Sequence, residues 1–125
     1  MYNQGSALLF RTPDFYAKKR VFFIPYAGAG ASISEPYYKA LLPEIDLIAL
    51  QLPGRENRIE EAPYESMEMA VSGMIDDILP LLDMPFVFWG HCSGALIAYE
   101  LVNKIKQMVN VEPDCLIISA CATPE

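Results

Sequence analysis

The chain has 125 residues, 53% of them hydrophobic and 20% charged, which is enough apolar material for one domain with a packed core. Nine basic side chains against 16 acidic ones give a formal net charge of −7, which argues against nucleic acid as a partner. No apolar run approaches the roughly 20 residues of a membrane span, and the amino terminus lacks the pattern of a signal peptide. We therefore expect a cytoplasmic protein without a membrane partner. Cys92, Cys115 and Cys121 form no Cys-x-x-Cys pair, so neither a disulfide framework nor a metal site is expected.

Short apolar runs alternate with longer helical patterns along the chain, which is typical of a parallel sheet covered by helices. The first run, Ala7–Arg11, is a weak candidate for an edge strand. Val21–Ile24 is a much clearer strand, because a continuously apolar run is typical of a strand buried on both faces. The basic residues just before it, Lys18, Lys19 and Arg20, are expected to lie in solvent.

One more strand and two helices are expected before the chain reaches its most informative motif. Tyr37–Leu42 predicts a short helix, Asp46–Leu50 the next strand, and Ser66–Leu82 an amphipathic helix with apolar residues at helical spacing. Phe86–Trp89 is the third clear strand. A further helix follows it, and Cys115–Ser119 is the last expected strand, in which Cys115 should be buried. The inner stripe of that further helix is expected to comprise Ile97, Leu101, Ile105 and Met108.

The motif is the sequence FVFWGHCSGAL, residues 86–96, in which an apolar strand runs into a turn and then a helix. Gly90 and Gly94 flank Cys92 symmetrically, as in the sharp turns that present a nucleophile at the top of an α/β sheet. A helix amino terminus also favours a thiolate, which would activate Cys92. Two alternatives remain open: Cys92 is a small buried apolar residue, or Ser93 is the attacking group.

An attacked carbonyl needs two donors for the oxyanion, and the sequence offers a candidate for each. One is the backbone amide of Ser93, directly after the tip of the turn. The other is the amide of Ala27, in the glycine-rich sequence PYAGAG that follows the strand Val21–Ile24. Taken alone, those glycines are equally compatible with a tight turn.

The combination of PYAGAG, LPGR and GHCSGA closely resembles the type II thioesterases of nonribosomal peptide and polyketide synthesis, from about Val21 to Pro124. The resemblance implies an α/β-hydrolase fold, with a truncated, mostly parallel sheet, helices on both faces, and Val21–Ile24 between the second and third strands. It places Cys92 at the nucleophile position, where the family usually carries serine, and the Ala27 and Ser93 amides at the oxyanion hole. The stretch 119–124 departs from the Ser-Gly-Arg type of turn usual in the family.

The resemblance further implies that residues 1–125 are the amino-terminal portion of a thioesterase domain. The lid, the catalytic aspartate and the histidine base of the family would follow it, and the single histidine, His91, is expected to be structural. No cofactor is expected, because the acyl substrate is carried on the phosphopantetheine of an acyl or peptidyl carrier protein. A bare sheet edge after Cys115–Ser119 predicts self-association.

Arg55 and Arg58, in the sequence LPGRENR, are weaker candidates for binding the substrate. They follow the strand Asp46–Leu50, at the edge where α/β proteins bind ligands, and a guanidinium suits the phosphate of phosphopantetheine. Pairing with the nearby glutamates is an equally simple role for them.

The reaction expected is acyl transfer from a thioester to Cys92 followed by hydrolysis. Onward transfer of the acyl group and a non-catalytic role in carrier binding remain alternatives.

Overall fold

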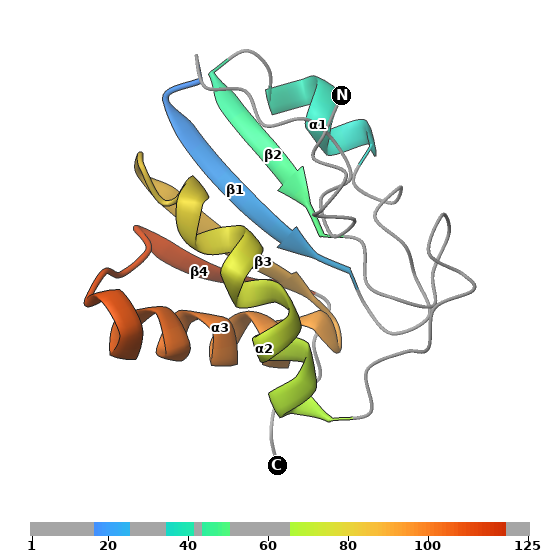
Figure 1. Ribbon diagram of the computed structural model, residues 1–125. Coiled ribbons are helices and arrows are strands. Elements are labelled where there is room, and N and C mark those ends of the chain that lie inside the picture. Colours follow the sequence, from blue (N-terminus) through green and yellow to red (C-terminus); the bar gives the residue numbers. More distant parts are fainter. Residues whose placement is uncertain (1–16, 26–34, 42–43, 51–65, 120–125) are drawn as a thin grey trace.

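The computed structural model describes residues 17–25, 35–41, 44–50 and 66–119. Its centre is one parallel sheet with the strand order β2-β1-β3-β4 (Figure 1). The strands are β1 (Lys19–Ile24), β2 (Ile45–Ala49), β3 (Phe86–His91) and β4 (Cys115–Ser119). The prediction that the first clear strand lies between the second and the third is confirmed. The candidate strand Ala7–Arg11 lies outside the described residues.

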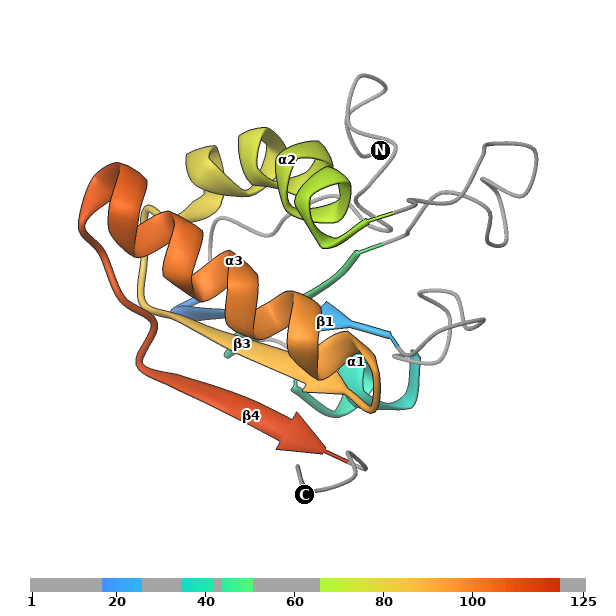
Figure 2. The same ribbon diagram turned by 90° about the horizontal axis from the view of Figure 1, so that it is seen from below.

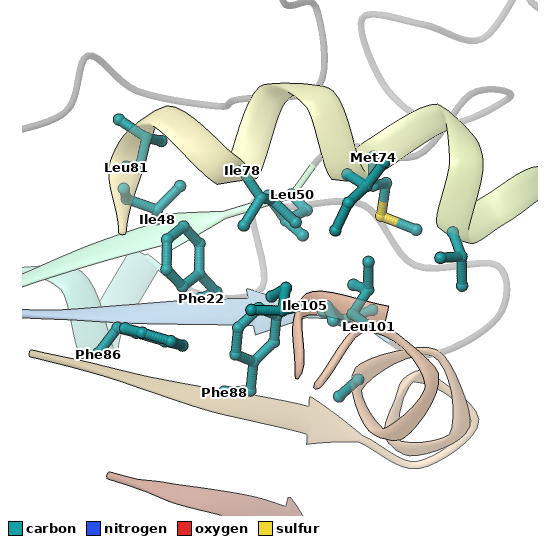
Figure 3. Close-up of a cluster of buried hydrophobic side chains, with 14 of the residues drawn as sticks. Phe22, Ile48, Leu50, Met74, Ile78, Leu81, Phe86, Phe88, Leu101 and Ile105 are labelled. Atoms are coloured by element: carbon teal, nitrogen blue, oxygen red, sulfur yellow. The ribbon is translucent and has the colours of Figure 1, made fainter. Parts of the chain in front are cut away.

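Helices lie on both faces of the sheet, as expected (Figures 1 and 2). Helices α2 (Met67–Ile78) and α3 (Gly94–Val109) cover one face, and α1 (Glu35–Leu41) lies on the other. Successive strand residues point to opposite faces, so Phe22 of β1 packs under α2 and α3 while Phe23 faces the side of α1. Figure 3 shows the larger cluster, in which side chains of α2 and α3 meet those of the strands.

The helix boundaries follow from local chemistry. The Ser66 hydroxyl accepts a hydrogen bond from the Met69 N–H at 3.1 Å and caps the start of α2. Pro80 lies in the 3₁₀ turn η3 (Leu79–Leu81) that ends this helix. Helix α3 ends at Asn110, which adopts a left-handed conformation with φ of 56°. No helix within the described ranges is long and apolar enough to cross a lipid bilayer.

Strand β4 is far more exposed than its sequence predicts. Cys115 is exposed rather than buried, and Ile117 and Ile118 are 44% and 52% exposed. The edge position itself was expected: among the described residues β4 pairs with β3 alone and forms the edge of the sheet (Figure 2). The burial of Cys115 was the part of the prediction that was wrong, because an edge strand has fewer neighbours to cover its side chains. Met108, expected in the inner stripe of α3, is 48% exposed and lies in the last turn of that helix. Self-association through this edge stays a prediction, which light scattering of the purified chain would test.

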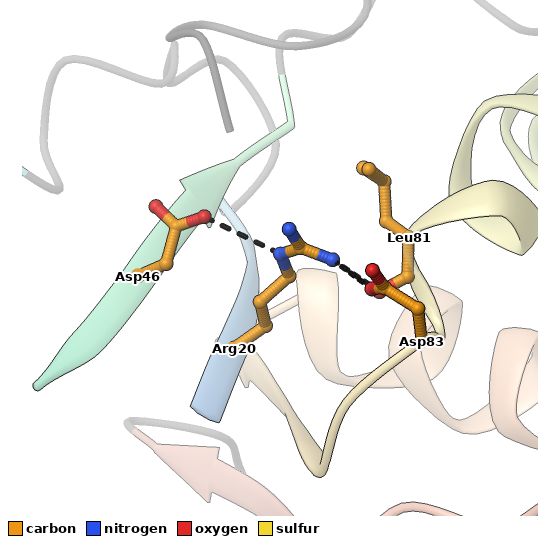
Figure 4. Close-up of polar contacts among 4 residues, drawn as sticks. All are labelled: Arg20, Asp46, Leu81 and Asp83. Atoms are coloured by element: carbon orange, nitrogen blue, oxygen red, sulfur yellow. Dashed lines mark hydrogen bonds and ion pairs between the residues drawn. The ribbon is translucent and has the colours of Figure 1, made fainter. Parts of the chain in front are cut away.

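Arg20 corrects a second expectation, because its side chain is fully buried rather than solvated. It shares a side of β1 with Phe22, so it points toward the α2 face at the amino end of the sheet. Its guanidinium donates to the Asp46 carboxylate at 3.4 Å and to the Leu81 carbonyl oxygen at 2.8 Å, and it also pairs with Asp83 (Figure 4). One side chain therefore ties β1 to β2 and to the segment between α2 and β3.

We expect Arg20→Ala to lower the free energy of unfolding by about 3–5 kcal/mol, because the 2% exposed Asp46 carboxylate loses the guanidinium that it faces. Urea unfolding followed by the fluorescence of Trp89, the single tryptophan, measures the change. Lys18→Ala is the matched control. It removes an ion pair with Glu44 whose side chains are 82% and 65% exposed, so we expect a change within about 0.5 kcal/mol. Equal effects of the two substitutions would contradict a structural role for the buried cation.

Candidate active site

The turn between β3 and α3 has the backbone geometry of a sharp elbow. Strand β3 ends at His91, Cys92 and Ser93 form the turn, and α3 begins at Gly94. Cys92 has a φ of 55°, in the left-handed region that residues with a side chain seldom adopt. The side chain of Cys92 is exposed, so it is not the small buried apolar residue that was one alternative. A strained residue of this kind persists only when its surroundings hold it in place.

Two backbone hydrogen bonds hold Cys92, one on each side of the residue. Its N–H donates to the carbonyl oxygen of Ser119 on β4 at 2.7 Å, and its carbonyl oxygen accepts from the N–H of Ala95 at 3.0 Å. In a trans peptide the C=O and the following N–H point in opposite directions. Since the Cys92 carbonyl points toward the first turn of α3, the N–H of Ser93 points the other way, out of the helix end. This is the direction in which an oxyanion donor has to face.

Both flanking glycines are required by close backbone packing. A methyl group on Gly90 would lie 2.5 Å from the Cα of Ala95 and 2.8 Å from its N. A methyl group on Gly94 would collide with the carbonyl oxygen of Ile24 and lie 2.6 Å from that of Pro25. The first turn of α3 therefore rests directly on the end of β1. Contact with β1 thus explains Gly94, and contact of β3 with the first turn of α3 explains Gly90.

The structure places two of the five predicted site residues and brings them together. Cys92 and Ser93 are adjacent in the turn at the carboxyl end of β3. Ala27, Arg55 and Arg58 lie outside the described residues. The segment that carries Ala27 does begin next to the turn, because Ile24 pairs with Gly90 and Pro25 lies against Gly94.

The residue that sequence reasoning missed at this end of the sheet is Ser119. Its hydroxyl oxygen lies 2.7 Å from the indole Nε1 of Trp89 and 2.8 Å from Nδ1 of His91. His91 is half-buried and bonded to the neighbouring strand, which fits the structural role expected for it. The position of Ser119 as the last residue of the strand beside the turn was the available signal. Nothing in the sequence alone showed that its register would place it opposite His91.

Comparison with known proteins gives a consistent result. Residues 19–125 match a family model described as a thioesterase domain. The chain is similar to the gramicidin S biosynthesis protein GrsT of Aneurinibacillus migulanus, with 43% identity over 109 residues, or 87% of this chain. Two solved structures are also similar. One is the RedJ thioesterase from the prodiginine biosynthetic pathway in Streptomyces coelicolor, with 31% identity and a TM-score of 0.80 over 87% of this chain.

The other solved structure is the type II thioesterase BorB from the borrelidin biosynthetic cluster, with 28% identity and a TM-score of 0.83 over 93% of this chain. These likenesses confirm the predicted fold class, an α/β-hydrolase sheet with helices on both faces. The chain spans less than half the length of each of these proteins: 43% of GrsT, 41% of the RedJ chain and 46% of the BorB chain.

The close packing at Gly94 predicts that substitution by alanine will lower the free energy of unfolding there, whereas the same substitution at Gly73 should raise it. We expect Gly94→Ala to lower the free energy of unfolding by about 3 kcal/mol, the upper end of typical overpacking costs, because the methyl group meets backbone oxygen atoms that have no room to move. Gly73→Ala, at an exposed position inside α2, should instead raise it by about 0.5–1 kcal/mol, since alanine favours a helix interior. Urea unfolding of both variants provides the measurement. A Gly94→Ala variant as stable as the parent would contradict the close packing of α3 on β1.

Proposed function

The chain belongs to the thioesterase domain family, and from this membership we propose that it acts on acyl thioesters with Cys92 as the nucleophile. The observation that carries the proposal is the turn at Cys92, where an exposed thiol lies on a left-handed residue between a central strand and a helix. Such a turn lifts the side chain clear of the backbone and leaves it accessible to a substrate. Ser93 is the weaker candidate for the attacking group, because it stands one residue past the left-handed position.

The proposed first step is attack of the Cys92 thiolate sulfur on the carbonyl carbon of the substrate thioester. A new carbon–sulfur bond forms to Cys92, the bond to the pantetheine sulfur breaks, and the departing thiolate takes up a proton. The negative charge that develops on the carbonyl oxygen needs donors already in place. We assign this role to the N–H of Ser93, whose orientation the Ala95 hydrogen bond supports, and to the N–H of Ala27.

A cysteine at this position changes the energetics of the acyl-enzyme. Serine would convert a thioester into an oxyester of lower energy, whereas cysteine exchanges one thioester for another at nearly equal energy. The acyl group on Cys92 therefore stays reactive toward water. We propose hydrolysis as the second step, in keeping with the family to which the chain belongs.

The proposed substrate is an acyl or peptidyl group on the phosphopantetheine arm of a carrier protein. The names of the similar proteins support this choice, since they belong to the biosynthesis of gramicidin S, prodiginine and borrelidin. Such pathways assemble their products on carrier-bound thioesters. Arg55 and Arg58 are the candidates for the phosphate of the arm, because both follow β2 in the sequence. Strand β2 is parallel to β1 and β3, so it ends on the same side of the sheet as the strand that leads into the Cys92 turn.

The proposal is tested by incubating the chain with an acyl-pantetheine thioester and measuring the intact mass. We expect one acyl group per chain, and peptide mapping should place it on Cys92. Cys92→Ala should carry none, while Cys115→Ala should be acylated like the parent, because Cys115 is also exposed but lies at the opposite end of the sheet. Acylation that survives Cys92→Ala would refute the assignment of the nucleophile.

A second prediction concerns the identity of the attacking atom. A serine hydroxyl is a weak nucleophile until a base removes its proton, whereas a thiol ionises more readily. The chain has a single histidine, and its Nδ1 is hydrogen-bonded to Ser119. We therefore expect Cys92→Ser to be acylated at least about 100-fold more slowly than the parent, the scale of an absent general base. Equal rates in the same mass assay would show that a base acts at the turn and that the thiol is not required.

A further inference from the structure

Ser119 makes three contacts at the end of β3 and in the turn that follows. One is made by its backbone carbonyl oxygen and two by its side-chain hydroxyl. Its carbonyl oxygen accepts the N–H of Cys92 at 2.7 Å. Its hydroxyl oxygen lies 2.7 Å from Nε1 of Trp89 and 2.8 Å from Nδ1 of His91. Trp89 and His91 are two residues apart, so both side chains stand on the same face of β3 with Gly90 between them. A single residue of the edge strand therefore holds the strand end and the strained residue that follows it.

We propose that Ser119 is a positioning residue for the acylation of Cys92, which rests on the function proposed above. Ser119 touches neither the thiol nor the substrate in this assignment. It acts through the backbone of the turn, whose orientation decides whether the Ser93 N–H faces the oxyanion. No pattern in the sequence points to this role, because it depends on the pairing of His91 with Ser119 across the two strands.

The protons of the hydroxyl contacts follow from their chemistry. An indole N–H can only donate, so Trp89 fills one lone pair of the Ser119 oxygen. The hydroxyl oxygen also lies within hydrogen-bond distance of Nδ1 of His91. We assign the hydroxyl proton to that contact, which requires the imidazole tautomer with its proton on Nε2. The result is a directed chain from the indole through the hydroxyl to the imidazole.

The hydrogen bonds of the Ser119 hydroxyl stabilise β4 at its end, where a strand frays most readily. Ser119 is the last residue of β4, and β4 is the edge of the described sheet, with two isoleucines that are largely exposed. Strand ends of this kind open more readily than the interior of a sheet. Fraying of Ser119 would weaken the hydrogen bond from the Cys92 N–H and relax the left-handed backbone that it helps to hold. The bridge to Trp89 and His91 opposes this opening.

Two reactions of the Cys92 thiol distinguish an effect of Ser119 on the orientation of the turn from an effect on the exposure of the thiol. Acylation by an acyl-pantetheine thioester passes through an oxyanion and requires the Ser93 N–H to face it, whereas alkylation by iodoacetamide forms no oxyanion. We expect Ser119→Ala to slow acylation about tenfold, less than the roughly 100-fold loss typical of deleting an oxyanion donor. Alkylation of Cys92 should stay within about twofold, because the thiol itself is unchanged.

Three variants complete the comparison. Ser119→Thr keeps the hydroxyl and should restore acylation to within about twofold of the parent. Ser72→Ala, an exposed serine on α2, is the matched control and should change neither reaction. Should Ser119→Ala not fold, Trp89→Phe removes one donor of the same bridge while keeping a ring against Phe23 and Tyr37. It too should slow acylation relative to alkylation.

A spectroscopic readout is available because the chain has one tryptophan and one histidine. In a ¹⁵N–¹H spectrum the single indole N–H should move upfield and exchange faster in Ser119→Ala, and return in Ser119→Thr. The ¹⁵N shifts of His91 in the parent should report a proton on Nε2. An unchanged indole resonance in Ser119→Ala would refute the bridge itself.

The kinetic outcomes distinguish this inference from the function on which it rests. A parent chain that is not acylated overturns both. A parent that is acylated, with Ser119→Ala acylated equally fast, overturns the positioning role alone. Equal losses of acylation and alkylation in Ser119→Ala also overturn it, because they would mean that the substitution only hides or unfolds the thiol.

Discussion

The arrangement of the candidate site depends on one close approach, that of the first turn of α3 to the end of β1. Gly94 lies against the carbonyl oxygens of Ile24 and Pro25, with no room for a methyl group between them. Because the helix begins directly on the neighbouring strand, the chain has to reverse within two residues of β3. Cys92 takes the left-handed conformation that this reversal requires. The exposure of its thiol is thus a result of backbone packing and not of a loop that happens to reach solvent.

The two ends of the sheet are held by different forces. At the amino end, the buried guanidinium of Arg20 links three segments through carboxylates and a backbone oxygen. At the carboxyl end, the turn is held by hydrogen bonds to the backbone carbonyl and the hydroxyl of Ser119. A fixed cation close to Cys92 would alter the chemistry of the thiol, so confining Arg20 to the far end separates stability from reactivity. The apolar cluster under α2 and α3 joins the two ends (Figure 3).

The turn at Cys92 is held mainly by backbone contacts, and a thiol nucleophile needs less help from neighbouring side chains than a hydroxyl does. A sulfur atom that attacks a thioester needs to be exposed and correctly aimed, and the turn at Cys92 with its oriented peptide meets both needs. The described residues around the turn contribute mainly backbone groups, together with the hydroxyl of Ser119. A serine nucleophile needs a base to remove its proton before it attacks. A cysteine thiol ionises more readily and therefore depends less on such a base.

The sequence by itself determined the strands, the helices and the turn at Cys92, because each has a local signature. The strand order followed from the resemblance to the thioesterase family, and the structure confirms it. Continuous apolar runs such as Val21–Ile24, helical periodicity, and glycines around Cys92 are properties of neighbouring residues along the chain. Only the tertiary structure decided the burial of Arg20, the exposure of Cys115 and the contacts of Ser119. Burial and pairing depend on which strand becomes an edge and which residue of the next strand lies opposite, and these are relations between segments that no local pattern encodes.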